Sequence, residues 1–206
     1  MLILIDKPRG CTSYDVIRAM KRTLGKRKIG HSGTLDPMAT GLLIIGVDDG
    51  CKQLQSVQDS DKRYTATVNL SGTSTTGDEE GEITPVSGPV PTPEQVTEAV
   101  QKFIGEIRQT PSIYSAIKIK GKPAYRYARE GKEVDIPERT VHIRDIQIKD
   151  YSFPDLTLDV RCSKGTYIRT LGEDLGKSLG LGGYLTMLRR TEIGPYNVRD
   201  ARTIIM

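Results

Sequence analysis

The segment 30–47 constrains the fold more than any other part of the sequence. Its first half, GHSGTLDPMATG, is rich in glycine and carries one carboxylate, Asp36, directly before a proline. Its second half, LLIIGV, is continuously apolar, which is typical of a buried strand. Proline disfavours helix at the residue before it, and glycine permits positive φ or close backbone approach. We therefore expect a rigid loop at the mouth of a buried strand, with Asp36 held in a fixed direction.

Two interpretations of this loop remain open from its residues alone. One is a functional site, because surface loops rarely need such control over the direction of a single acid. The other is structural, namely a tight turn with a left-handed residue and a capping aspartate. His31 stands five positions before Asp36 on the same loop.

The hydrophobic pattern along the rest of the chain predicts the fold class. We expect strands at 2–5, 42–47, 63–71, 113–119, 140–151 and 156–162, and a turn-rich hairpin at 72–88. We expect helices at 13–24, from a capping box at Thr92 to Gly105, and at 124–130, 166–179 and 184–190. Strands and helices do not alternate in the βαβ manner. The prediction is therefore an α+β fold with a mixed, mostly antiparallel central sheet flanked by helices and loops.

Length and cysteine usage limit the class of protein. A chain of 206 residues is long enough for one domain with a sizeable core. No apolar run approaches the roughly 20 residues of a membrane span. The three scattered cysteines, Cys11, Cys51 and Cys162, fit a reducing cytoplasm and show no metal-ligand spacing. His31 and His142 are too few and too far apart to indicate a metal site.

The net charge of +4 is mild, so the distribution of charge is more informative. Residues 18–28 hold six basic residues and no acid. A second basic stretch, 118–132, is interleaved with Tyr125 and Tyr127, whereas 78–82 is acidic. Either basic stretch alone is more often a solvated helix face. Two of them around one candidate acid favour a nucleic-acid partner.

Three further side chains are candidates for a site. Tyr64 opens an alternating strand, and Tyr167 and Arg169 lie in the expected first turn of a helix. Either tyrosine could simply be a half-buried structural residue. Arg169 is unusual, because the helix dipole disfavours a cation near a helix N-terminus. Its position suggests an acidic partner, for which Asp36 is one candidate, although an exposed arginine remains an alternative.

Four ordered segments resemble the TruB-type tRNA pseudouridine synthases. They are the loop 30–43, the Lys62-Arg63-Tyr64 step, the segment around Tyr114-Ser115-Ala116, and Ser163 to Arg169. The resemblance runs from about Leu2 to Arg199, nearly the whole chain. It implies the pseudouridine synthase catalytic fold and the conversion of uridine-55 in the tRNA T-loop to pseudouridine, without metal or cofactor. In this reaction the N-glycosidic bond breaks, the uracil rotates, and a C–C bond forms at C5.

The resemblance also implies roles for individual residues. Asp36 matches the essential aspartate, acting as a nucleophile or by promoting proton loss at C2′; these two routes stay open. Tyr64 matches the tyrosine that stacks on the uracil and can take the C5 proton, and Arg169 matches the arginine that pairs with the aspartate. The expected substrate-binding residues are Lys7, His31, Asp78, Tyr167 and Leu188, with His31 filling the space left by the flipped base.

The expected partner is tRNA, through its T-arm stem-loop, bound by a cytoplasmic monomer with no membrane or metal partner. The residues expected along the RNA backbone are Lys26, Arg27, Lys28, Lys118, Arg126 and Arg129. We expect a single catalytic domain over 1–206. We also expect that the small C-terminal RNA-binding domain of the PUA type, usual in bacterial members, is absent, and that tRNA binding is weaker, whether the chain is a minimal member or a truncated one.

Two other classes of function compete with this one. A glycoside hydrolase would ordinarily need two carboxylates flanking the scissile bond, and only Asp36 has a site-like setting. A non-catalytic RNA-binding module would keep the basic patches and tyrosines but would not need Asp36. Substitution of Asp36 therefore separates an enzyme from a binding module.

Overall fold

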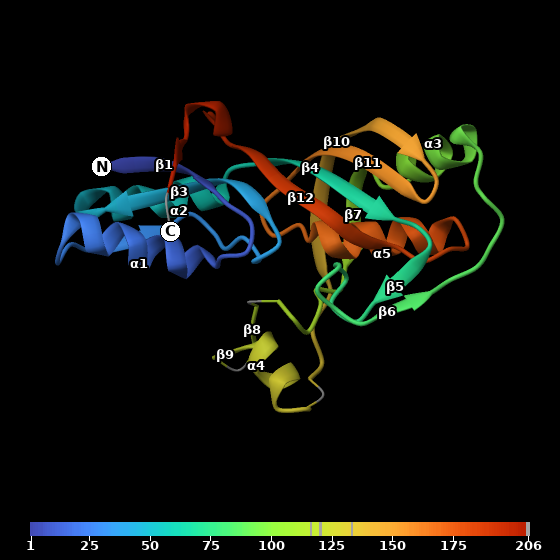
Figure 1. The fold of residues 1–206 in the computed structure, drawn as a ribbon, viewed down its shortest axis with the longest axis horizontal. Coiled ribbons are helices and arrows are strands. Elements are labelled where there is room, and N and C mark those ends of the chain that lie inside the picture. The colour runs from blue at the N-terminus through green and yellow to red at the C-terminus, as the bar shows by residue number, and fades with distance from the viewer. Residues whose placement is uncertain (116, 120, 133, 205–206) are drawn as a thin grey trace. The chain divides into compact units, whose positions relative to one another are not determined.

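The computed structural model describes residues 1–115, 117–119, 121–132 and 134–204, without the side chains of Tyr125 and Arg129. The chain divides into two compact units (Figure 1). Unit 1 comprises Met1–Thr65, Arg161–Lys164 and Met187–Met206, and unit 2 comprises Ala66–Val160 and Gly165–Thr186. Three strands, β4 (Lys62–Asn69), β11 (Asp155–Cys162) and β12 (Tyr184–Ile193), have residues in both units.

The sheet of unit 1 is built around β3 (Thr40–Val47). Strand β1 (Leu2–Lys7) is antiparallel to β3, and β2 (Ile29–His31) pairs with it in the same sense. The last part of β12 is parallel to β3. The order is β14-β1-β3-β12, with β14 (Arg202–Thr203) parallel to β1 and β13 (Tyr196–Asn197) antiparallel to β12. The remaining elements are α1 (Ser13–Leu24), η1 (Asp48–Gln53), α2 (Leu54–Asp59) and η2 (Val198–Asp200).

Both faces of β3 are buried, which explains its continuous apolar sequence. Leu43, Ile45 and Val47 pack in one cluster with Val16 of α1. Leu42 and Ile44 pack in another cluster with Val57 of α2. Alternate residues of a strand point to opposite faces, so each cluster takes every second residue of the run. The predicted buried strand after the Asp36 loop is confirmed.

Helix α1 begins and ends where the sequence predicts. Thr12 is its N-cap, and its side chain accepts a hydrogen bond from the N–H of Asp15. The Asp15 carboxylate in turn accepts from the Thr12 N–H, which completes a capping box. Val16 and Ile17 face the core, and Arg18 lies on the exposed side. This helix therefore buries its apolar face and leaves its basic face in solvent.

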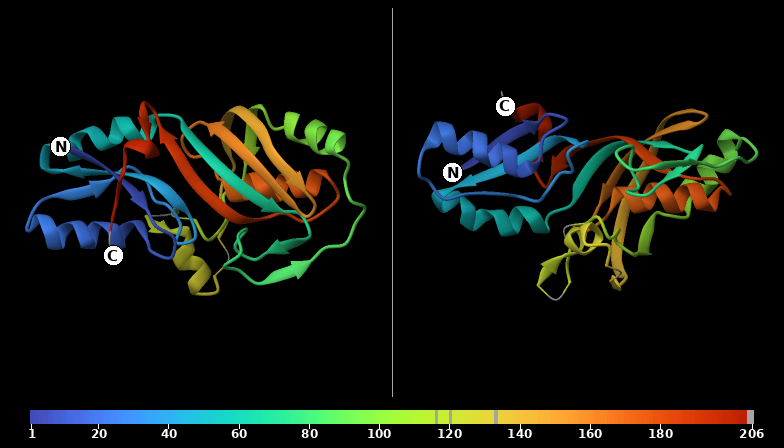
Figure 2. Two further views of the ribbon diagram at one scale, coloured as in Figure 1. Left: turned by 45° about the horizontal axis from the view of Figure 1, so that its top comes forward. Right: turned by 60° about the horizontal axis from the view of Figure 1, so that its bottom comes forward.

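Unit 2 has a sheet of order β12-β4-β11-β10-β7, with β10 (Arg139–Ser152) antiparallel to β7 (Gly105–Gln109). Helices α3 (Pro93–Gln101) and α5 (Ile168–Ser178) belong to this unit (Figure 1). Two short hairpins pair β5 (Gly72–Ser74) with β6 (Ile83–Pro85) and β8 (Lys118–Ile119) with β9 (Lys122–Pro123). Figure 2 shows β8, β9 and α4 (Ala124–Arg129) set apart from β10 and β11 of the same unit.

The predicted class, α+β with a mixed and mostly antiparallel sheet, is confirmed. The prediction of a helix at 184–190 is wrong, because this segment forms strand β12. Leucine, methionine and arginine favour helix locally, but pairing with β3 overrides that preference. The predicted strand at 113–119 is wrong except at Lys118–Ile119, and residue 116 lies outside the described residues. Helix α5 begins two residues later than predicted.

Among the described residues, no helix combines the length and apolar character needed to cross a membrane.

Candidate active site

The Asp36 loop is a tight turn that leads directly into β3. The Asp36 carbonyl accepts a hydrogen bond from the Ala39 N–H at 3.1 Å, with Pro37 at the second position of this turn. Gly33 and Gly41 have φ of +123° and +104°, a region that disfavours other residues. The Asp36 side chain is half-buried. The loop thus has the conformational control that its sequence predicts.

Side chains from β1 and α1 hold the loop from one side. The buried Ser13 hydroxyl accepts from the Leu35 N–H at 2.8 Å and donates to the Leu35 carbonyl at 3.2 Å. The Pro37 carbonyl accepts from the Gly10 N–H at 2.8 Å and from the Lys7 ammonium at 3.4 Å. Lys7, predicted to bind substrate, is completely buried, and its ammonium also donates to the carbonyls of Pro8 and Cys11. Lys7 therefore holds the loop through its hydrogen bond to the Pro37 carbonyl.

Arg190 of β12 holds both ends of the same loop. Its Nε donates to the Leu42 carbonyl at 2.8 Å, and its Nη2 donates to the Gly33 carbonyl at 3.2 Å. Its side chain is buried, with 2% of the residue exposed. Arg190 is absent from the predicted site residues, because the sequence pattern assigns its segment to a helix. A signal was available: the Arg189-Arg190 pair directly follows the apolar residues Met187 and Leu188, and a buried cation is rare.

Tyr64 of β4 lies within electrostatic range of Asp36 and Arg190 in unit 1. Burial raises the pKa of the Tyr64 hydroxyl, and the negative charge of Asp36 raises it further. A hydrogen bond with the Arg190 guanidinium, together with its charge, acts in the opposite direction on this pKa. The raised pKa keeps the hydroxyl protonated at neutral pH. The structure therefore brings together the predicted acid, the predicted tyrosine and an arginine that was not predicted.

His31 lies on β2 at the start of the loop. Its Nδ1 accepts from the Gly33 N–H at 3.2 Å. Burial, and then the charge of Arg190, lower the pKa of the imidazole, so the ring is neutral at pH 7. With Nδ1 acting as acceptor, the proton of the neutral ring is on Nε2. Leu188, also predicted for the site, is buried on β12 of the same unit.

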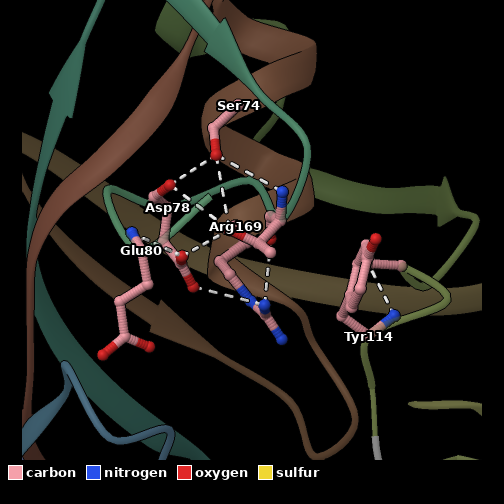
Figure 3. Close-up of polar contacts among 7 residues, drawn as sticks. Ser74, Asp78, Glu80, Tyr114 and Arg169 are labelled. Atoms are coloured by element: carbon pink, nitrogen blue, oxygen red, sulfur yellow. Dashed lines mark hydrogen bonds and ion pairs between the residues drawn. The ribbon is translucent and has the colours of Figure 1, made fainter. Parts of the chain in front are cut away.

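In unit 2, Arg169 and Asp78 form a buried ion pair, with Nη1 and Oδ2 at 3.3 Å (Figure 3). The same Nη1 donates to the Thr76 carbonyl at 2.9 Å. The Asp78 carboxylate accepts from the Thr76 hydroxyl at 2.6 Å and from the Glu80 N–H at 3.2 Å. Asp78 is thus an acidic partner of Arg169 within its own unit, and the pairing of Arg169 with Asp36 stays a prediction.

Tyr167, directly before α5, is held through its backbone. The side chain of Gln109 accepts from the Tyr167 N–H at 3.0 Å and donates to the Tyr167 carbonyl at 3.2 Å. Gln109 is buried on β7, and its register partner Arg139 places its guanidinium 5.7 Å from the centre of the Tyr167 ring. Gln109 is also absent from the predicted site residues. The residues around Gln109 in the sequence do not indicate whether a glutamine on such a short strand is buried or exposed.

The predicted RNA-backbone residues divide between the two units. Lys26, Arg27 and Lys28 are exposed after α1, and the Arg27 Nε is 2.6 Å from the Asp48 carboxylate. Lys118 and Arg126 are exposed in unit 2, and the side chain of Arg129 lies outside the described residues. Within the described part of the chain, no group of three or more His, Cys, Asp or Glu residues could hold a metal ion.

Comparison with known families decides what kind of protein carries this site. Residues 21–168 match the TruB family pseudouridylate synthase (N terminal domain). Residues 169–206 match the tRNA pseudouridylate synthase B C-terminal domain. The chain belongs to the TruB pseudouridylate synthase family. The TruB match covers the Asp36 loop, Tyr64, Asp78 and Tyr167, and the second match begins at Arg169.

Individual relatives agree with the TruB assignment. The tRNA pseudouridine synthase B of Corynebacterium diphtheriae is 46% identical over 211 residues, covering 98% of this chain and 70% of the relative. That of Corynebacterium efficiens is 48% identical over 206 residues, covering 97% and 69%. A solved Cbf5-Nop10-Gar1 complex contains a similar chain, with a TM-score of 0.78 and 29% identity. An H/ACA RNP bound to a substrate RNA contains another, with a TM-score of 0.73 and 27% identity. Each match covers 98% of this chain, which spans about half the length of those solved chains.

Proposed function

We propose that this TruB-family chain isomerises uridine-55 in the T-loop of tRNA to pseudouridine, with Asp36 as the essential acid. The observation that carries the proposal is the placement of Asp36. It lies on a rigid, multiply anchored loop and within electrostatic range of Tyr64. Its relatives are named for this activity, and their similarity covers nearly all of the chain.

In the proposed reaction the C1′–N1 bond breaks, the uracil rotates, and a C1′–C5 bond forms. The hydrogen on C5 leaves as a proton and N1 gains a proton, so the reaction is an isomerisation that needs no oxidant or reductant. Asp36 acts in its charged form, either on C1′ as a nucleophile or by promoting loss of the C2′ proton. Because Tyr64 is protonated at neutral pH, its first role is to stack on the flipped base.

Further residues take supporting roles in this proposal. The resemblance gives Arg169 the role of pairing with the catalytic aspartate, and within unit 2 Asp78 fixes the direction of its guanidinium. The resemblance gives Tyr167 and Leu188 the role of contacting the uracil. A base must leave its stack to be reached, at a cost of a few kcal/mol, and a tyrosine platform returns about 1–3 kcal/mol by stacking. The neutral His31 can fill the vacated stack without adding a charge.

The proposed substrate is a tRNA recognised through its T-arm stem-loop, bound by a monomer in the cytoplasm. One structural neighbour, the H/ACA RNP, is bound to a substrate RNA, which supports RNA as the ligand class. The exposed Lys26, Arg27, Lys28, Lys118 and Arg126 supply positive charge for the phosphates. Lys7, being buried, contributes by holding the loop at Pro37.

The test is an Asp36→Asn variant, assayed by tritium release from tRNA labelled at uracil C5. We expect release to be lost while tRNA binding is largely retained, because asparagine keeps the size of the side chain without its charge. The matched control is Asp49→Asn, an exposed aspartate of the same unit that pairs with Lys52 on the surface. The control should release tritium at the wild-type rate. Wild-type release by Asp36→Asn would leave a non-catalytic RNA-binding module as the better interpretation.

A further inference from the structure

We propose that Arg190 is a positioning residue for the isomerisation: its guanidinium closes the Asp36 loop and fixes the Tyr64 hydroxyl beside it. This inference rests on the proposed function of the loop. It adds a residue to which neither the sequence pattern nor the comparisons assign a role.

The first support is that one side chain bonds to both ends of the loop. The Gly33 carbonyl precedes the Asp36 turn and the Leu42 carbonyl follows it, and both accept from the same guanidinium. A guanidinium has five N–H donors in a rigid, planar fork, so two acceptors bound to it are fixed relative to each other. The separation of the loop ends, and with it the direction of Asp36, is therefore set by Arg190.

The second support is the contact with Tyr64. The Arg190 guanidinium acts on the pKa of the Tyr64 hydroxyl both through its charge and through a side-chain hydrogen bond, and Asp36 acts on the same hydroxyl through its charge. The Arg190 guanidinium thus interacts both with the loop that carries Asp36 and with Tyr64, the side chain proposed to stack on the base. A lysine at this position would keep the positive charge, but its single nitrogen cannot reproduce the fork.

The third support is that Arg190 itself cannot shift. Its backbone is the register partner of Gly41 in the parallel pairing of β12 with β3. A Cβ atom on Gly41 would lie 2.3 Å from the Arg190 carbonyl oxygen, which shows how closely the two backbones approach. The charge of the same guanidinium also lowers the pKa of His31, on the loop, and of Lys62, at the start of β4.

The test is Arg190→Lys, measured by single-turnover tritium release and by tRNA binding. We expect the rate to fall by about 10–100-fold, because a small misplacement of a reacting group costs that much, while tRNA affinity is unchanged. Hydrogen exchange should increase in the peptide covering residues 30–43. The matched control is Arg189→Lys, on the same strand, whose guanidinium binds Asp6 at 3.0 and 2.7 Å and, at only one end of the loop, the Thr40 hydroxyl at 3.3 Å. The control should keep the wild-type rate, and exchange of the peptide should increase less than in Arg190→Lys.

Tyr64→Phe gives a second arm that does not depend on the folding of the arginine variant. It removes the hydroxyl partner of Arg190 and keeps the ring, and exchange of residues 30–43 should again increase. Unchanged exchange in Tyr64→Phe, or a wild-type rate in Arg190→Lys, would overturn the inference. Equal losses of rate and melting temperature in the Arg189 and Arg190 variants would also overturn it, because they would indicate a purely structural role. Absence of tritium release by the wild type would instead contradict the proposed function itself.

Discussion

Three buried cations in unit 1 donate to backbone carbonyls. Lys7, Lys62 and Arg190 expose 0%, 9% and 2% of their surface, and their ammonium and guanidinium groups donate to carbonyl oxygens near the Asp36 loop and the start of β4. Buried charge is costly unless it is well hydrogen-bonded, and carbonyl acceptors provide those bonds without cancelling the charge. Lys7 and Arg190 therefore place positive charge beside the backbone of the loop that carries Asp36.

Lys62 gives a prediction for the pH dependence of stability. Burial, and then the charge of Arg190, lower its pKa from 10.5 to about 8. Between these two values the unfolded chain binds more protons than the folded chain, so this group makes stability rise with pH. We expect the melting temperature of the wild type, relative to Lys62→Met, to increase from about pH 7.5 to about pH 9.5. A constant difference across this range, in thermal melts at matched ionic strength, would contradict the assignment.

Individual site residues could be predicted from the sequence only where they belong to a recognisable local pattern. Asp36 and His31 lie in an unusual glycine-rich loop, and Arg169 is an unusual cation at a helix start. Gln109 and Arg190 act through contacts with residues distant in the chain, and their own neighbours in sequence do not reveal those contacts. Hydrogen bonds from a side chain to the backbone of a distant residue therefore could not be predicted from this sequence.

At the scale of elements, the junction of the loop with β3 is the most constrained point. Gly41 combines a positive φ with a backbone approach that leaves no space for a side chain. We predict that Gly41→Ala lowers the free energy of unfolding by about 2–5 kcal/mol, from backbone strain and steric overlap together. Urea denaturation of both proteins measures this difference.

The matched control for this prediction is Gly30→Ala at the other end of the loop. A Cβ atom there would meet the end of the Leu54 side chain at 3.0 Å and the Cys51 sulfur at 4.0 Å but no backbone atom, and the φ of Gly30 is not positive. Gly30→Ala should therefore stay within about 1 kcal/mol of the wild type. Similar losses in both variants would show that the close approach of Gly41 to Arg190 is not the cause.

Elements with strong local signals were predicted well, and elements defined by pairing were not. Helices α1 and α3 both have capping boxes, and both begin where these predict. Strand β12 has helix-favouring residues, and its burial does not alternate regularly along the strand. Its assignment depends on partners that lie far away in the chain, so local propensity gave the wrong answer.

At the scale of the whole molecule, the basic segment after α1 predicts salt-dependent binding. Lys26, Arg27 and Lys28 are exposed, although Arg27 is partly neutralised by Asp48. The slope of log affinity against log salt should be less steep in a triple alanine variant of these residues. Each lost phosphate contact changes this slope by about 0.7–0.9. Filter binding to tRNA over a salt series measures it.

The control for this prediction removes the same charge elsewhere. Lys102, Lys149 and Lys177 are exposed in unit 2, and their triple alanine variant has the same net charge. Its slope should match that of the wild type. If both triple variants reduced the slope equally, net charge rather than local contact would explain the binding.

The fold class of the whole chain could be predicted from the order of its strands and helices, but its division into two units could not. Unit 1 is assembled from three separate segments, because the chain returns to it at Arg161–Lys164 and again at Met187–Met206. Hydrophobic periodicity predicts which face of a segment is buried, but it does not predict which distant segment packs against that face. A unit built from separate segments therefore has no linker or change of composition in the sequence that marks where it begins and ends.

The bond from Arg190 to Leu42 has a consequence for the timing of synthesis. The two residues are 148 positions apart, so a ribosome adding roughly 5–20 residues per second needs about 7–30 s to proceed from one to the other. During that interval the nascent chain already contains Asp36, Tyr64 and the anchors from β1 and α1. It lacks the arginine that closes the loop. A chain released before β12 is made would therefore contain the proposed catalytic acid without the group proposed to fix its direction.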